Sequence, residues 1–158
     1  MPSSKAKIKT WKRLTTLRQL WGWQGKKVVF TNGVFDILHA GHVQLLERAR
    51  SLGDMLIVGV NSDASAHRLG KGPGRPVNRL RDRAALLAAL SCVDAVVPFA
   101  EDTPEPLLSK LKPDVLVKGA DYGRQQIAGA QHAGRVVRVT LKAGYSTTNL
   151  IRRLQGQS

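Results

Sequence analysis

The stretch KVVFTNGVFDILHAGHVQLLERARSLG, residues 27–53, contains the clearest strand-to-helix transition in the chain. It opens with the apolar run Lys27–Phe30, which is typical of a buried strand. From His42 to Leu52 apolar residues recur at helical spacing, and Gly53 follows as a stop signal. The tetrapeptide His39-Ala40-Gly41-His42 lies at the transition itself. Because a helix N-terminus presents unpaired N–H groups and a partial positive charge, this pair of imidazoles predicts a site for an anion such as phosphate.

Strand and helix patterns alternate along the rest of the chain. Further strands are predicted at Met55–Val60, Ala95–Pro98, Val115–Val117 and Arg135–Leu141, and further helices at Arg79–Leu90, at Pro104–Lys112 and from near Ser146 through Leu154. Asn78 is the expected cap of the first of these helices, and Thr103 precedes Pro104 at the start of the second. Such alternation implies right-handed crossovers. We therefore expect an α/β fold, a Rossmann-like three-layer α/β/α domain with a five-stranded parallel sheet.

The N-terminal part differs from the rest in pattern. Residues 1–25 are predicted to form a basic extension, with residues 1–7 disordered and Trp11, Leu14, Leu17 and Trp21 on one side of an amphipathic helix. The tryptophans are interpreted as packing or as a dimer contact rather than as base-stacking groups. Residues 26–158 are expected to form a single domain, because no linker or internal repeat divides them.

Charge is distributed unevenly along the 158 residues. The net charge is +14, yet all 11 acidic residues lie between Asp36 and Asp121, so the excess of Lys and Arg is at the two ends. Basic ends could attract nucleic acid, an acidic membrane surface or a polyanionic substrate. Since no nucleic-acid motif is present, a solvated basic surface is the simpler interpretation, and nucleic acid is not expected as a partner.

Composition also limits the class of protein. The single cysteine, Cys92, excludes an intrachain disulfide and disfavours a thiolate metal cluster. No apolar run approaches the roughly 20 residues that span a bilayer, so membrane insertion is not expected. The basic N-terminus lacks the apolar segment of a secretory signal, and a cytoplasmic location is predicted.

Polar or glycine-rich residues follow four of the predicted strands, at Thr31–Asp36, Asn61–Asp63, Lys118–Tyr122 and 142–148. In open parallel sheets the carboxyl ends of the strands meet at one edge, where ligands bind. The chain has neither a G-x-x-x-x-G-K-[ST] loop nor a G-x-G-x-x-G turn after its first strand. Phosphate contacts must then come from the histidine pair, helix N-termini and separate Lys and Arg side chains.

Residues Thr31 to His42 resemble the HxGH signature of the nucleotidyltransferase superfamily that includes cytidylyltransferases and phosphopantetheine adenylyltransferase. Ser146-Thr147-Thr148 resembles its second signature. More specifically, the chain is similar to the D-glycero-β-D-manno-heptose 1-phosphate adenylyltransferases. The matching segments are Asn61–Ser65, Arg75–Asn78, Glu101–Pro104, Pro113–Gly119, Asp121-Tyr122 and Ser146–Asn149. They extend over nearly all of the predicted nucleotidyltransferase domain, residues 26–158.

The resemblance implies transfer of AMP from ATP, bound with Mg²⁺, to heptose 1-phosphate. It implies catalytic roles for His39, His42 and Lys118, and a nucleotide site formed by Thr31, Asn32, Gly33, Phe35, His39, His42, Lys71, Gly119, Asp121, Tyr122, Ser146 and Thr147. Asp36 and Arg75 are candidates for the sugar-phosphate side, and no protein-built metal site is expected. A homo-oligomer and a separate heptose kinase acting upstream are the implied partners.

Several residues keep a second interpretation. The histidine pair could bind zinc or fill space, Ser146-Thr147-Thr148 could only cap a helix, and Lys71 could be a solvated loop residue. Asp36 could instead accept backbone N–H bonds, and Arg83 and Asp94 could organise the structure rather than touch substrate. At the level of function, a CTP:polyol-phosphate cytidylyltransferase, an FMN adenylyltransferase and an inactive, basic nucleic-acid-binding relative remain alternatives.

Overall fold

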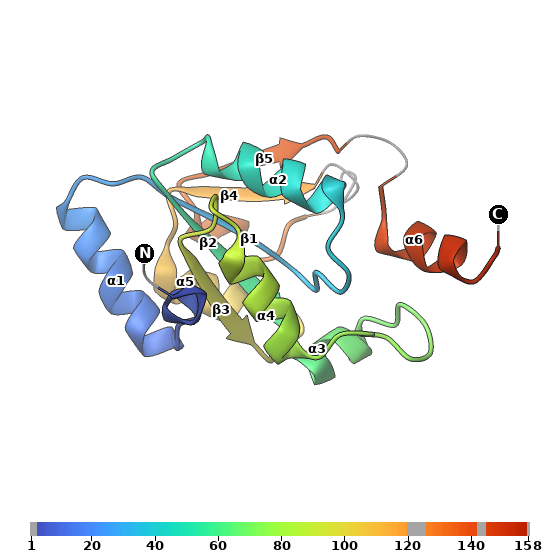
Figure 1. The fold of residues 1–158 in the computed structure, drawn as a ribbon. Helices are drawn as coiled ribbons and strands as arrows, with labels where there is room; N and C mark the ends of the chain where they lie inside the picture. The colour runs from blue at the N-terminus through green and yellow to red at the C-terminus, as the bar shows by residue number, and fades with distance from the viewer. Residues whose placement is uncertain (1–2, 120–125, 142–144, 158) are drawn as a thin grey trace.

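A computed structural model describes residues 3–119, 126–141 and 145–157. Five parallel strands form one twisted sheet between two layers of helices (Figure 1). The strands are β1 (Val28–Gly33), β2 (Met55–Asn61), β3 (Ala95–Phe99), β4 (Val115–Gly119) and β5 (Arg135–Val139), in the spatial order β3-β2-β1-β4-β5. The expected fold class and all five predicted strands are confirmed.

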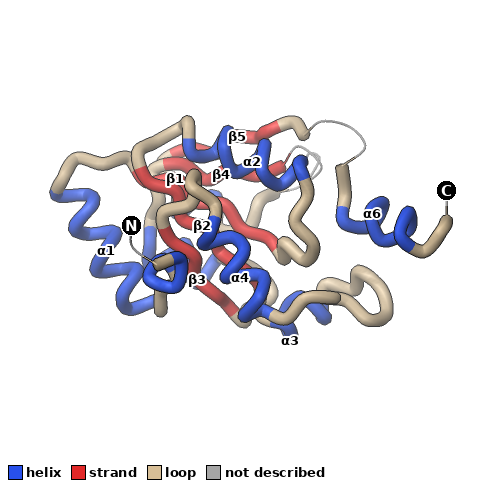
Figure 2. Tube along the Cα trace, viewed as in Figure 1, coloured by secondary structure: helices blue, strands red, loops and turns tan. Residues whose placement is uncertain are grey.

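Alternation along the strands divides the core into two halves. Val29 packs on one side of the sheet with α2 (Ala40–Arg50) and α4 (Leu80–Ala89). Val28 and Phe30 pack on the other side with α1 (Trp11–Trp23) and α5 (Glu105–Leu111). Because both faces are covered, β1 to β4 are apolar on both sides, as is typical of parallel sheets, whereas the edge strand β5 is largely exposed. Figure 2 shows the sheet between these helices, with the loops meeting at its edges.

The chain order reverses between β1 and β4, the two central strands. β1 pairs with β2 over six residues, from Val28–Met55 to Gly33–Val60, whereas its pairing with β4 covers only Val29–Val115 and Phe30–Leu116. Beyond that point the hydroxyl of Thr31 donates to the carbonyl oxygen of Val117 over 2.9 Å. The strands therefore separate at their carboxyl ends, which is where a parallel α/β sheet binds ligands.

The N-terminal segment is ordered, so the expected disorder of residues 1–7 is wrong for those described. Ser4–Lys7 form a short 3₁₀ helix, η1, and Ile8 bridges to Val96 beside β3. The helix predicted around Trp11 and Trp21 is confirmed as α1, whose Leu14 and Trp21 are buried in the core shared with α5. Packing on the edge of the sheet supplies the order that the local sequence lacks.

Two helix caps differ from the sequence expectation. Asn78 does not cap α4: the N-cap is Arg79, and the N–H of Leu80 instead donates to the carboxylate of Asp63 over 2.8 Å. Thr103 lies one position before the cap of α5, which is Pro104. Asp63 belongs to a helix that the sequence did not predict, α3 (Asp63–Arg68), capped by Ser62.

Three aspartates hold the amino edge of the sheet. The carboxylates of Asp54, Asp94 and Asp114 each accept a backbone N–H from a neighbouring strand region, over 2.7–2.8 Å. For Asp94, which also pairs with Arg50 at 3.0 Å, the organising role is confirmed. These three negative charges lie at the amino ends of the strands, opposite the carboxyl edge. No helix in the described part of the chain has the length and apolarity to cross a bilayer.

Candidate active site

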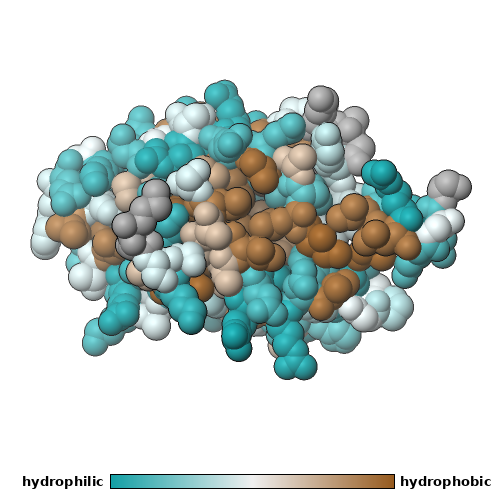
Figure 3. Space-filling model, viewed as in Figure 1, coloured by the Kyte–Doolittle hydropathy of each residue, from teal (hydrophilic) through white to brown (hydrophobic). Residues whose placement is uncertain are grey.

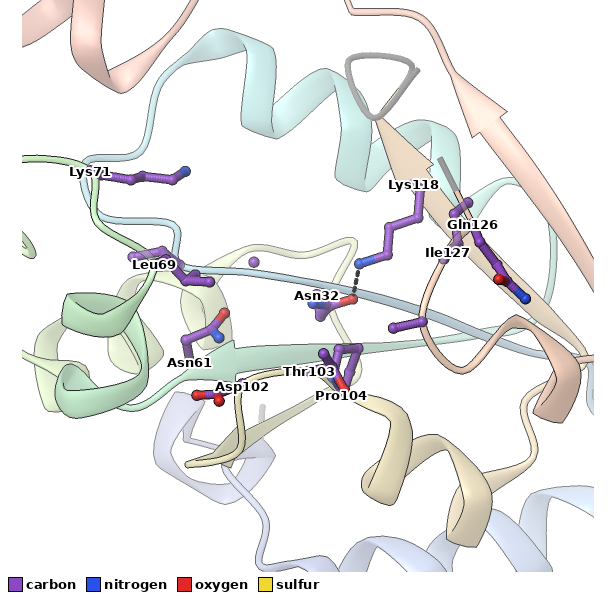
Figure 4. A pocket seen from close by; sticks show the side chains of 13 residues that line it. Asn32, Asn61, Leu69, Lys71, Asp102, Thr103, Pro104, Lys118, Gln126 and Ile127 are labelled. Atoms are coloured by element: carbon purple, nitrogen blue, oxygen red, sulfur yellow. Dashed lines mark hydrogen bonds between the residues drawn. The ribbon is translucent and has the colours of Figure 1, made fainter. Parts of the chain in front are cut away.

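Two adjoining cavities open where β1 and β4 separate. The larger, about 360 Å³, extends toward β2, α5 and the segment after residue 125, and the smaller, about 180 Å³, extends toward α2 and α6 (Thr147–Leu154). Five residues line both: Asn32, Gly33, Val34, Lys71 and Lys118. Figure 4 shows Lys118 reaching across the larger cavity to Asn32, with Lys71 on the far side. These shared residues surround the passage between the two cavities.

The histidine pair forms the start of α2. His39 is the N-cap, and its Nδ1 accepts the N–H of Gly41 over 3.1 Å, while Nδ1 of His42 accepts the N–H of His39 over 3.4 Å. The two rings are stacked, with centroids 3.8 Å apart. Gly41 permits this arrangement, because a Cβ there would lie 2.8 Å from Cβ of Tyr145 and 2.9 Å from Cε1 of His39. The signature is thus a local cap that fixes both imidazoles.

Burial keeps these imidazoles neutral. It lowers the pKa of His39 below its ordinary value, and burial together with the nearby His39 and Lys71 lowers the pKa of His42 to about 4. A neutral imidazole carries one N–H, and in both rings Nδ1 is occupied as an acceptor. The proton must therefore be on Nε2, so each ring presents a neutral Nε2–H donor. Such donors bind phosphate oxygens without having to lose or gain a proton.

Lys118 supplies a buried cation at the end of β4. Its side chain is only 5% exposed, and its ammonium donates to the side-chain oxygen of Asn32 at the end of β1. Burial lowers the pKa of Lys118 to about 8. At neutral pH the group is thus charged in an environment that disfavours charge, and an incoming anion would relieve this cost.

Asp36 anchors the loop that carries two of the candidate cations. Its carboxylate accepts N–H bonds from Val77 (3.0 Å) and Asn78 (2.9 Å) and pairs with Nε of Arg75 at 2.7 Å. Burial alone would raise the pKa of Asp36, but these three donors lower it below its usual value. Asp36 therefore accepts backbone N–H bonds, as its second interpretation in the sequence analysis described. Both Asp36 and Arg75 also line the smaller cavity.

Arg83 joins three of the loops at this edge. It is fully buried, and one of its terminal nitrogens donates to the carbonyl oxygens of both Val34 and Asn61, each over 2.8 Å. Its other donors reach the carbonyl oxygen of Asn78 and the carboxylate of Asp63. All three nitrogens of the guanidinium thus donate within the protein, which confirms the organising role expected for Arg83.

The loop after β1 holds an unusual backbone conformation. Phe35 has φ of 49°, in the left-handed region that side-chain-bearing residues rarely occupy. Its ring is buried and makes an edge-to-face contact with His42, at a centroid distance of 5.2 Å. Arg83 donates to the carbonyl oxygen of the preceding residue, Val34, and the following residue, Asp36, is held by its hydrogen bonds to the 75–78 segment. The conformation thus packs Phe35 against His42.

The second signature lies at the start of α6. Ser146 is the N-cap and accepts the N–H of Asn149 over 3.0 Å, and the hydroxyl of Thr147 donates to the carbonyl oxygen of Ile37 over 3.2 Å. A small hollow of about 150 Å³ links Ser146 with His39 and Arg153. The cap reading of Ser146 is therefore correct, and the same helix end still presents free donors beside the histidines.

The structure brings most of the predicted site together. The residues that line one or both main cavities are Thr31, Asn32, Gly33, Phe35, Asp36, His42, Lys71, Arg75, Lys118, Gly119 and Thr147. His39 and Ser146 lie at the adjoining hollow, whereas Asp121 and Tyr122 lie outside the described residues. Sequence reasoning assigned no role to the polar wall of the larger cavity, formed by Asn61, Asp102, Thr103 and Gln126, although it placed Asn61 at the ligand-binding edge. The first three belong to segments on which the resemblance rests, and that was the available signal.

Three known proteins that share one name are similar in sequence to this chain. The bifunctional protein HldE of Azotobacter vinelandii is 56% identical over 85% of this chain, and that of Mesorhizobium japonicum is 58% identical over 87%. The HldE of Sulfurimonas denitrificans is 51% identical over 98% of the chain. The chain spans about a third of the length of these relatives, 28–32%.

Solved structures show the same fold. A lipopolysaccharide core biosynthesis protein from Thermoplasma volcanium is 30% identical, with a TM-score of 0.65 over 75% of this chain and 99% of that one. A pantoate-beta-alanine ligase from Francisella tularensis, 17% identical, shares the fold over 96% of this chain and 79% of its own, with a TM-score of 0.58. The cytidylyltransferase-like family profile matches residues 30–153, from β1 into α6. With its histidine pair at the switch point of the sheet, the chain belongs to the cytidylyltransferase-like family.

Proposed function

We propose that this protein transfers AMP from ATP to D-glycero-β-D-manno-heptose 1-phosphate, giving ADP-heptose and pyrophosphate for lipopolysaccharide core biosynthesis. The observation that carries the proposal is the stacked pair of neutral imidazoles beside the buried Lys118 and the helix N-terminus, all at one sheet edge. Heptose as the acceptor is supported by the similarity of the later sequence segments and by HldE relatives that are 51–58% identical.

The reaction needs positioning more than proton transfer. An oxygen of the sugar phosphate, already ionised at neutral pH, attacks the α-phosphorus of ATP. The bond from that phosphorus to the oxygen that bridges to the β-phosphate breaks, and its electron pair leaves with pyrophosphate. The carboxylate of Asp36 is fully occupied by Arg75, Val77 and Asn78, which agrees with a reaction that requires no general base. The rate enhancement then comes from hydrogen-bond donors and cations that stabilise the negative charge developing on the phosphate oxygens in the transition state.

The shared lining indicates where the reacting phosphorus lies. A group transferred between two substrates must be reachable from both, so we place the α-phosphate at the passage lined by Asn32, Lys71 and Lys118. The triphosphate then extends toward His42 and Thr147, with His39 and Ser146 beyond. Thr31, Gly33, Phe35 and Gly119 complete the nucleotide side, and Asp121 and Tyr122 remain proposals for the base and ribose.

The larger cavity suits the sugar. Its polar wall of Asn61, Asp102, Thr103 and Gln126 offers hydrogen-bond partners for hydroxyl groups. Arg75 lines the smaller cavity instead, and we assign it to the phosphate of the acceptor, with Asp36 holding it in place.

Magnesium fits this site only as part of the nucleotide. Within residues 3–119, 126–141 and 145–157, no three His, Cys, Asp or Glu side chains come together in a group that could hold a metal ion. A hard cation that prefers several oxygen ligands would thus find them mainly on the phosphates. We propose further that a separate kinase supplies the sugar 1-phosphate, that the reaction takes place in the cytoplasm, and that the protein is a homo-oligomer.

Pyrophosphate release distinguishes this function from its alternatives. The protein is assayed with ATP or CTP against heptose 1-phosphate, a polyol phosphate and FMN. We expect release with ATP and the heptose phosphate, and a fall of at least about 100-fold in His42→Ala. His67→Ala, which removes an exposed imidazole from α3, is the matched control and should keep full activity. Equal rates with CTP, or no release with any pair, would overturn the proposal.

A further inference from the structure

Helix α1 has two unlike sides, and only one of them is used by the fold. Leu14 and Trp21 are buried against the sheet and α5. The other side turns a stripe of Arg13 and Leu20 outward, and Trp23 continues this stripe at the end of the helix. Leu17, by contrast, is half-buried and packs against the core. Leu20 is 43% exposed and Trp23 is 84% exposed. On the face shown in Figure 3, apolar side chains reach the surface over α1 among hydrophilic ones.

Basic residues flank this stripe, and the N-terminal segment that contains it has no acidic residue. The chain has eight Lys and Arg residues up to Lys27 and no acidic residue before Asp36. Lys7 and Arg18 are committed to the carbonyl oxygens of Leu90 and Leu111. Lys9, Lys12 and Arg13 line a shallow hollow of about 550 Å³ at the start of α1, and the exposed Lys26 and Lys27 follow its end.

The combination of exposed apolar side chains and basic residues on α1 favours one of the possible binding partners. A second copy of the chain would place like charges against each other, which costs free energy. Nucleic acid would satisfy the cations and stack on an aromatic ring, but it offers nothing to the exposed, aliphatic Leu20. The surface of an anionic bilayer takes both parts, because apolar side chains and Trp enter the headgroup boundary while Lys and Arg bind lipid phosphates.

We propose that the outward side of α1 docks this protein onto the surface of an anionic lipid bilayer. The attachment is peripheral and reversible, since one helix stripe with flanking cations is a single amphipathic contact. The docking side lies at the opposite end of the molecule from α6 and its adjoining site residues (Figure 1), so the cavities stay open to substrates.

Vesicle co-sedimentation tests this proposal. The full chain is mixed with vesicles of phosphatidylglycerol and phosphatidylcholine in equal parts, and with vesicles of phosphatidylcholine alone. We expect binding to the first only, weakened by salt, with the emission of Trp23 shifted to the blue. Trp23→Ala should lower the partition coefficient at least about fivefold and abolish the blue shift, and Lys12→Glu with Arg13→Glu should lower the coefficient at least about tenfold.

Control substitutions on other helices distinguish binding by this side of α1 from a general effect of the protein's positive charge. Leu154→Ala removes a side chain that is 76% exposed on α6, and Arg48→Glu with Arg152→Glu reverses two exposed cations on α2 and α6. These variants should keep the partition coefficient within about twofold of the wild-type value. Absence of binding to the anionic vesicles, or unchanged binding by Trp23→Ala, would overturn the proposal. Tighter binding to duplex DNA or polyglutamate than to vesicles, lost in the same variants, would overturn it as well.

Discussion

Replacing Lys118 with methionine should make the protein more stable and nearly inactive. The side chain is 5% exposed, and burial lowers its pKa from the ordinary value of 10.5 to about 8. That difference means that the charged form is disfavoured in the folded state by about 3 kcal/mol at neutral pH. Losing the hydrogen bond to Asn32 costs about 1 kcal/mol, because Asn32 is half-buried beside the cavity and can bind water.

The net expectation is a gain of about 2 kcal/mol, or about 4 to 8 °C in Tm for a chain of this size. The pH dependence identifies the cause. Because the pKa of Lys118 is lower in the folded state, the unfolded state binds more protons between pH 8 and 10.5. The stability of the wild type therefore rises through this range, and the advantage of Lys118→Met is complete below pH 8 and lost toward pH 10.5.

Calorimetry of both proteins at several pH values measures this directly. AMP transfer, followed by pyrophosphate release, should fall at least about 100-fold in Lys118→Met. Lys110→Met, an exposed position on α5, should change neither quantity. A Lys118→Met protein that is less stable than the wild type at pH 7, or whose advantage does not change with pH, would refute the reasoning.

Three further predictions concern the support of the site. The pKa of His42 is lowered to about 4, so the unfolded state binds more protons than the folded state below pH 6.5. Up to about 3 kcal/mol of stability is therefore lost as pH falls from 6.5 to 4. A His42→Asn protein, measured by urea denaturation at several pH values, should lack that loss. Arg83→Met should cost about 2 to 6 kcal/mol in the same assay, because it leaves the carbonyl oxygens of Val34 and Asn61 without their donor, at about 1 to 3 kcal/mol each; an unchanged midpoint would contradict this. Gly41→Ala should cost about 1 to 3 kcal/mol and lower kcat, since its methyl group would meet Tyr145; full activity would show that the histidine cap tolerates the displacement.

The strands β1 to β4 could be predicted because each contains a short apolar run buried on both faces, and the edge strand β5, which is largely exposed, because it is rich in valine. Their carboxyl ends could not, since Thr31, Asn32 and Gly33 look like loop residues in the sequence. They continue β1 because the backbone pairs with β2 as far as Val60, whatever side chains it carries. Helix α3 was missed for a related reason: its six residues carry no helical apolar period, and its cap is Ser62.

The chemistry-bearing residues were predictable where a local motif names them. His39 and His42 form their own cap, so their geometry follows from four consecutive residues. Asp36 was left between two interpretations because its partners, Arg75 to Asn78, are about forty positions away in the sequence. The wall of the larger cavity is assembled from separate loops whose meeting depends on the whole sheet, so the segments that resemble the family did not by themselves indicate that Asn61, Asp102 and Thr103 share a cavity.

The most direct test of the proposed reaction follows ¹⁸O from the phosphate group of heptose 1-phosphate by ³¹P NMR. If the acceptor oxygen attacks the α-phosphorus of ATP, the label should remain in ADP-heptose, including the oxygen that bridges its two phosphorus atoms, and the pyrophosphate released should be unlabelled. Label in pyrophosphate, or conversion of ATP to ADP and phosphate in place of a nucleotide sugar, would contradict the account.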